Sequence, residues 1–129
     1  MPEVRDGHGV VVATVHAEAD GTVVLVFAEG CRLDAVNTAP VVEAHVAAAH
    51  GQKRPTLADV RGLRSATREA RELAAGPPVA AITSRMALIV GNPVTRTLGN
   101  FFLMVTSPKY PTRLFTDVAA ARPWLRAAE

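Results

Sequence analysis

The side chains that most often bind metal ions or transfer protons are few in this sequence and do not converge. Four histidines occur, whereas a metal site needs three or four ligands that meet at one point. His45 and His50 lie five residues apart in a predicted helix and therefore face different directions. His16 and Glu18 share one side of a predicted strand, but two ligands do not make a site. We expect no metal site and no cofactor.

The nucleophiles of the sequence lack the partners that catalysis requires. Cys31 is the single cysteine, and a reactive thiolate needs a base and surroundings that lower its pKa. The sequence fixes no base beside it, so we interpret it as an inert thiol. No pair of carboxylates is spaced for acid–base chemistry. We expect a protein without enzymatic activity, and catalysis by Cys31 or Ser65 is the alternative.

A group of basic residues could bind an anion or a partner. The candidates for this contact are Arg64, Ser65, Arg68, Arg71 and Arg85. Three of the arginines follow one another at intervals of four and three residues, the spacing of one helix face. Such a face could hold a phosphate, an acidic protein or an anionic lipid headgroup. Glu69 and Glu72 interrupt the group, so an ordinary solvated helix face is the alternative.

A second candidate surface is apolar. The candidates for a dimer contact or for contact with an apolar ligand are Phe101, Phe102, Leu103 and Met104. In a helix, the first two would share one stripe with Leu98 and Val105, and the other two would point away. A helix that is apolar nearly all round is either buried on both sides or in contact with a partner. Core packing, a homodimer contact and a pocket for a lipid or apolar ligand therefore all remain open.

The elements that must position these side chains follow from the hydrophobic spacing. Val-rich segments at 9–18 and 22–28, separated by Asp20-Gly21, predict a β-hairpin because glycine adopts a positive φ at little cost. The remaining spacing predicts helices at 33–51, 65–75, 86–105 (broken at 91–93) and 116–126, and strands at 55–60, 79–83 and 113–115. The order ββαβαβαβα predicts an α/β fold with a mixed, mainly parallel five-stranded sheet.

Two details of this order concern a binding site. Thr38 is the expected N-cap of the first helix, because Pro40 then falls in its first turn. In open sheets of this kind, ligands bind in the crevice beyond the carboxyl ends of the strands. We expect those ends at residues 62–67 and 83–86.

Composition limits the class of protein. The 129 residues suit one domain spanning 1–129, and 49% of them are hydrophobic, 20% charged and 5% aromatic. A formal charge of +2 without a large basic cluster indicates no nucleic-acid partner. Pro93 and Arg96 interrupt the longest apolar stretch, so we expect no membrane span. The single cysteine and an N-terminus without an apolar leader indicate a cytoplasmic protein.

Several segments resemble a known family. Residues 57–63, Leu-Ala-Asp-Val-Arg-Gly-Leu, resemble the strand, aspartate and small loop of STAS domains, which have the SpoIIAA-like fold. The C-terminal segment from Arg113 to Leu125, together with Gly99–Phe102, resembles the ending of uncharacterised SpoIIAA-like proteins of the STAS/SEC14 type.

The resemblance implies a non-enzymatic switch or partner-binding module. Anti-sigma factor antagonists of this fold carry a phosphorylatable serine at the start of the helix after the aspartate-containing strand. This chain departs from that pattern, because Arg68 lies near that position and Ser65 comes a few residues too early. We interpret Ser65 or Thr67 as a helix N-cap. The predicted function is a homodimeric module that acts on an unknown protein partner; the alternative is a SEC14-like carrier of a small apolar or lipid ligand.

Overall fold

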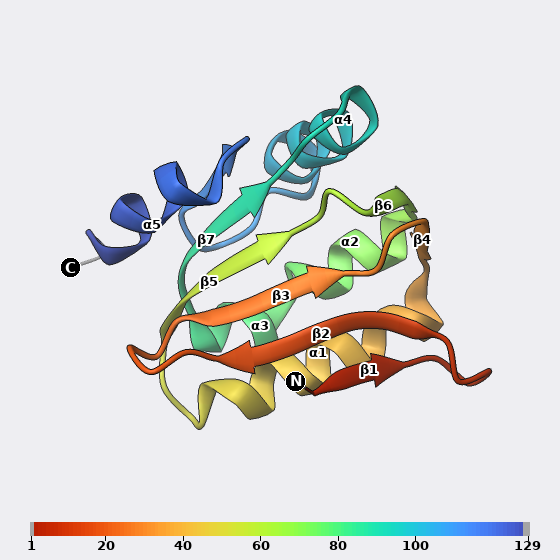
Figure 1. Ribbon diagram of the computed structural model, residues 1–129, viewed down its shortest axis with the longest axis horizontal. Helices are drawn as coiled ribbons and strands as arrows, with labels where there is room; N and C mark the ends of the chain where they lie inside the picture. Colours follow the sequence, from red (N-terminus) through yellow and green to blue (C-terminus); the bar gives the residue numbers. More distant parts are fainter. Residues whose placement is uncertain (1, 128–129) are drawn as a thin grey trace.

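The predicted N-terminal hairpin is the first element of a mixed sheet. In the computed structural model, which describes residues 2–127, Gly21 has a φ of +92° and Asp20 accepts a hydrogen bond from the amide of Thr22. Six strands form the sheet, in the spatial order β1 (Glu3–Arg5), β2 (Val11–Ala17), β3 (Val23–Phe27), β5 (Arg54–Asp59), β7 (Thr83–Ile89) and β8 (Thr112–Phe115) (Figure 1). The first three are antiparallel, and β3, β5, β7 and β8 are parallel to one another.

The helices cover the two faces of the sheet unequally. They are α1 (Ala35–Ala49), α2 (Arg68–Ala74), α3 (Pro77–Ile82), α4 (Pro93–Phe101), a π-helix η1 (Phe102–Thr106) and α5 (Val118–Arg126). Figure 1 shows α1, α2 and α3 together behind the sheet, whereas α5 lies apart from them at the β7 side. Two further strands, β4 (Cys31–Leu33) and β6 (Leu63–Ala66), pair in parallel as a separate ribbon.

Two hydrophobic cores result, one on each face. Val23 and Leu25 of β3 belong to the larger core, under α1 to α4, and Val24 belongs to the smaller core with Ala121 and Leu125 of α5. Because side chains alternate along a strand, β3 needs apolar residues on both faces. The predicted α/β class is confirmed, and the five-strand count is corrected to six strands plus the two-stranded ribbon.

The N-cap of the first helix lies earlier in the chain than the predicted Thr38. Asp34 is its N-cap, because its carboxylate accepts a hydrogen bond from the amide of Asn37 at 2.9 Å and its own amide donates to Asn37 Oδ1 at 2.8 Å. Thr38 lies inside the helix with only 3% of its surface exposed. The prediction that Thr38 caps the helix is therefore wrong, and its hydroxyl is available to the interior.

Two other predicted elements are wrong in type. Residues 79–83 were expected as a strand, but Pro77 and Pro78 begin the short helix α3, where the first turn needs no amide donors. The first part of the predicted helix at 86–105 is instead β7, which pairs with β5 on one side and β8 on the other. The break at residues 91–93 is confirmed, since Asn92 caps α4 and Pro93 begins it.

The two outer strands of the sheet are short and polar. β1 has three residues, of which Glu3 and Arg5 are exposed and form an ion pair. β8 has four residues, follows the exposed Pro111 and exposes Arg113. Charged residues and proline on an outer strand hinder the addition of another strand.

Replacing Asp34 tests the corrected helix start. The Asp34→Ala variant should lower the free energy of unfolding by about 1 kcal/mol, because the amide of Asn37 loses the carboxylate that accepts its hydrogen bond. Urea denaturation followed by circular dichroism measures the change. The control is Glu43→Ala, an exposed acidic position on the same helix, which should stay within about 0.5 kcal/mol of the parent. Equal effects would show that the Asp34 cap contributes nothing.

Candidate functional site

The predicted arginine stripe is divided by the structure. Arg64 and Ser65 lie on strand β6, where Ser65 pairs with Arg32 of β4, so they do not belong to a helix. Helix α2 begins at Arg68, and its N-cap is Thr67, whose hydroxyl accepts a hydrogen bond from the amide of Ala70 at 3.1 Å. The prediction of one helical stripe through Arg64 is therefore wrong, and of the two proposed N-caps Thr67 is confirmed.

The two arginines of α2 have different surroundings. Arg68 points to solvent and pairs with Glu72 at 3.0 Å, with 79% of the Arg68 side chain exposed. Arg71 is half-buried: its Nη1 donates a hydrogen bond of 2.6 Å to the carbonyl of Ala66, and its guanidinium lies 4.5 Å from the ring centre of Phe101. Its Nε is buried and has no hydrogen-bond partner among the described residues. Arg71 therefore has a buried donor that no described residue satisfies.

Arg85 does not join this group. It lies on β7 and is held by α5, because its Nη1 donates to the carbonyl of Trp124 at 2.9 Å and its guanidinium lies 4.8 Å from the Trp124 ring centre. Residues 83–86 are the first residues of β7, so the expectation that they lie at the carboxyl end of a strand is wrong. The carboxyl end of β7 leads instead to Gly91, which lies against the Arg61 side chain.

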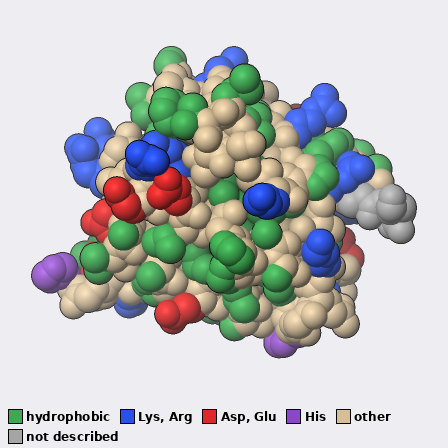
Figure 2. Space-filling view, turned by 180° about the vertical axis from the view of Figure 1, so that it is seen from behind, with side chains coloured by type: hydrophobic (Ala, Val, Ile, Leu, Met, Phe, Trp, Pro, Cys, Tyr) green, Lys and Arg blue, Asp and Glu red, His purple; other side chains and the backbone are tan. Residues whose placement is uncertain are grey.

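The apolar candidates also divide between interior and surface. Phe102 is buried, with 7% exposed, and Leu103 is half-buried, but Met104 is 81% exposed. We define the apolar patch as Phe101, Met104 and Val105, which are 43%, 81% and 62% exposed. Figure 2 shows hydrophobic side chains gathered at the top of the molecule, beside basic and acidic ones. The predicted segment therefore supplies both a core residue and an exposed surface.

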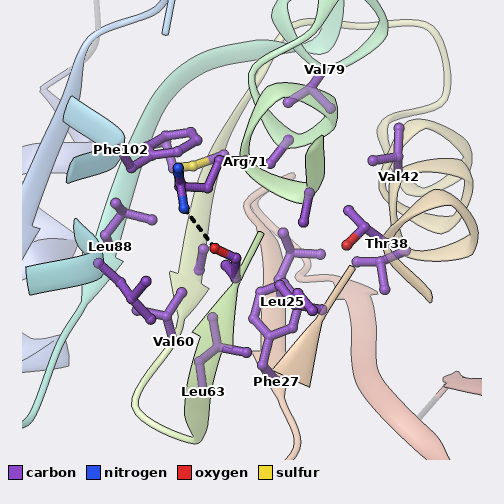
Figure 3. A pocket seen from close by; sticks show the side chains of 18 of the residues that line it. Leu25, Phe27, Thr38, Val42, Val60, Leu63, Arg71, Val79, Leu88 and Phe102 are labelled. Carbon is purple, nitrogen blue, oxygen red and sulfur yellow. Dashed lines mark hydrogen bonds between the residues drawn. The ribbon is translucent and has the colours of Figure 1, made fainter. Parts of the chain in front are cut away.

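Beneath Phe102 and α2 lies a cavity of about 100 Å³ that is partly open to the surface (Figure 3). Leu25, Ala58 and Leu88 of the sheet line one side of it, and side chains of α1, α2 and α4 contribute to the rest of its lining. Most of its lining is aliphatic, and the polar residues that reach it are Thr38, His45 and Arg71. The Thr38 hydroxyl is buried and has no hydrogen-bond partner in the part of the chain that the structure describes.

His45 is a neutral side chain in this interior. Its Nε2 lies 3.1 Å from the hydroxyl of Thr56, and only 2% of its surface is exposed. Burial lowers the pKa of His45 from 6.5 to about 4, because the charged imidazolium would lose its hydration. At neutral pH the ring therefore contributes a hydrogen bond and no charge.

A groove on the outside adjoins the cavity. We call it the outer groove; its lining residues are Arg68, Arg71, Glu72, Phe101, Val105 and Thr106, and its volume is about 320 Å³. Arg71 lines both the cavity and the outer groove. It therefore stands at the boundary between an apolar interior and a charged surface.

The cavity lining is the feature that sequence reasoning missed. Thr38 was interpreted as a cap and Arg71 as part of a surface stripe, and Leu88 was placed in a helix. The lining residues come from ten different elements and one loop, so no local spacing connects them. The only available signal was the low aromatic content of 5%, which leaves a core of small side chains.

Cys31 does not have the environment of a catalytic nucleophile. Burial raises the pKa of its half-buried thiol, and the charges of Asp34 and Asp6 raise it further. The neutral thiol is therefore favoured. Within residues 2–127, no three His, Cys, Asp or Glu side chains come together as metal ligands would. In the same range, no helix combines the length and hydrophobicity needed to cross a lipid bilayer.

A comparison with protein families places the chain. A family model described as "Domain of unknown function (DUF7793)" matches residues 16–129. The chain belongs to the DUF7793 family. A search of curated proteins finds no match to it.

Two solved structures resemble this DUF7793 domain. One is an uncharacterized protein from the DUF3478 family with a SpoIIAA-like fold, from Shewanella loihica PV-4; it is 19% identical, with a TM-score of 0.58, over 88% of this chain and 91% of that chain. The other is an anti-sigma factor antagonist from Mycobacterium paratuberculosis, 17% identical, with a TM-score of 0.57, over 88% of this chain and 92% of that chain. The predicted SpoIIAA-like fold is confirmed.

The buried histidine predicts a dependence of stability on pH. Because the pKa of His45 is lower in the folded than in the unfolded chain, the unfolded chain binds a proton first as the pH falls. The contribution of neutral His45 to the free energy of unfolding should be complete above its ordinary pKa of 6.5. It should be lost as the pH falls to about 4. The loss should be on the order of 3 kcal/mol.

Denaturant titrations between these pH values measure the effect. The His45→Gln variant keeps a hydrogen-bonding group but cannot be protonated in this range, so its stability should depend much less on pH. His8→Gln, at an exposed histidine, should behave like the parent. A pH dependence that is the same with and without His45 would contradict the assignment.

Proposed function

We propose that this DUF7793 domain is a non-enzymatic regulatory module that acts through protein contacts, and that it forms a homodimer through α2, α4 and η1. The exposed apolar patch carries the proposal, because Met104 and Val105 are more than half exposed on the same helical turn. Exposed apolar side chains that gather in one place are typical of protein contacts. The solved anti-sigma factor antagonist with this fold supports a regulatory role exerted on another protein.

The charges beside the patch suit a second copy of the same chain. Arg68 at the start of α2 and Glu72 one turn later both line the outer groove. A twofold axis that makes the two α2 helices antiparallel would bring Arg68 of one copy near Glu72 of its partner. Their pairing within one chain is exposed and contributes little to stability, so it can be exchanged for pairing between chains.

The free thiol of Cys31 supports a cytoplasmic location for the module, because the cytoplasm keeps cysteines reduced.

The cavity favours a second candidate function, the binding of a small apolar or lipid ligand. A ligand in the cavity would lie beside α2 and η1, and both functions therefore use the same part of the fold.

Size-exclusion chromatography with light scattering tests the homodimer. At micromolar concentration we expect twice the 13.6 kDa mass of one chain. Met104→Glu should weaken the dimer by about tenfold or more, because the contact would have to bury a carboxylate. The matched control is Val36→Glu, which is equally exposed at 81% but lies on α1. A monomeric parent protein, or equal effects of the two variants, would overturn this contact.

A further inference from the structure

We propose that the cavity binds the hydrocarbon chain of a small aliphatic carboxylic acid and that Arg71 binds its carboxylate. The inference develops the ligand-binding candidate named above by assigning a ligand class to the cavity. It does not depend on the homodimer, because the cavity lies within one chain.

The cavity has the size and lining for a short alkyl chain. Aliphatic side chains such as Leu25, Val60 and Leu88 surround it, and about 100 Å³ is available. Since a water-sized group needs about 10–15 Å³ of such volume, the cavity holds on the order of seven to ten non-hydrogen atoms. An apolar chain gains free energy for each methylene that it buries there.

Arg71 provides a site for the acid group at the edge of this space. Its Nη1 is occupied by the carbonyl of Ala66, but its buried Nε has no partner among the described residues. Nε and Nη2 form the edge of the guanidinium that binds a carboxylate through two parallel hydrogen bonds. The structure shows no ion pair between Arg71 and a described carboxylate. The edge that includes Nε therefore has no carboxylate partner among the described residues, and we assign it to the ligand.

The orientation of the ligand follows from the position of Arg71. Its guanidinium stacks on Phe101, and the residue lines the outer groove as well as the cavity. A carboxylate placed there stays close to water, whereas the alkyl chain extends inward. A charge is costly to bury unless it is paired, so this is the favourable direction.

Thr38 lies at the far side of the cavity from Arg71. Its hydroxyl is buried, lacks a partner in the described part of the chain and lines the cavity. Figure 3 shows Thr38 and Arg71 on opposite sides of the cavity. A ligand that crosses the cavity from Arg71 extends toward Thr38.

Titration with a series of fatty acids tests the proposal. Butanoate, hexanoate, octanoate, decanoate and dodecanoate are added to isotope-labelled full-length protein, and amide resonances are followed by NMR. Affinity should rise about fourfold for each added methylene and stop rising near octanoate, when the cavity is full. The shifted resonances should belong to cavity-lining residues. No shifts at millimolar octanoate, or an affinity that continues to rise through dodecanoate, would overturn the proposal.

Two arginine variants separate the cavity from surface charge. Arg71→Gln should weaken octanoate binding by about tenfold or more and leave the binding of octanol unchanged, because octanol has no carboxylate. The matched control is Arg68→Gln, on the same helix but outside the cavity, which should bind octanoate like the parent. Equal losses in both variants would show general attraction to a basic surface and would contradict the assignment.

A third variant tests the cavity itself. Ala74→Leu adds volume at a half-buried, cavity-lining position, so the chain length at which affinity stops rising should become shorter. Thermal unfolding establishes that each variant is folded. Light scattering on the same samples separates the two proposals. A monomer that binds octanoate would contradict only the homodimer proposal. A dimer that does not bind octanoate would contradict only the ligand proposal.

Discussion

The parallel pairing of β5 between β3 and β7 is the constraint on which the rest of this fold depends. Parallel neighbours cannot be joined by a tight turn, so each connection must cross a face of the sheet. From β3 to β8 the chain always advances in the same direction across the sheet, and right-handed crossovers then put every connection on the same face. The helices α1 to α4 share that face, and only the segment after β8 remains to cover the other with α5.

A shared face requires small side chains where helices meet. Ala66, Ala70 and Ala74 bring α2 and β6 close to the sheet, and the few aromatic residues do not fill the space that remains. The same geometry therefore leaves an apolar cavity of about 100 Å³, and an apolar molecule that enters it is removed from water. Arg71 is placed where such a molecule would carry its charge.

The sequence predicted the elements whose signals are local. Asp20-Gly21 between Val-rich runs identified the hairpin, and the last helix was predicted at 116–126, where Asp117 caps it in the structure. The segment Met86–Ile89 could not be assigned in the same way, because a short apolar run fits a buried strand as well as a buried helix. Its type is decided by pairing with residues that are far away in the chain. The candidate site was predicted only as separate residues: Arg71 was named, but its inward direction depends on β6, which was interpreted as part of a helix.

The short outer strands limit how this molecule can associate. An extended peptide that joins a sheet needs a run of free amide and carbonyl groups, and β1 and β8 present only three and four residues. Pro111 removes a donor just before β8, and the Glu3–Arg5 pair occupies the surface of β1. Recognition by strand exchange or by fibre-like stacking is therefore disfavoured at both ends of the sheet. The protein contact proposed above is accordingly assigned to helices, whose side chains can change in sequence without altering the order of the strands.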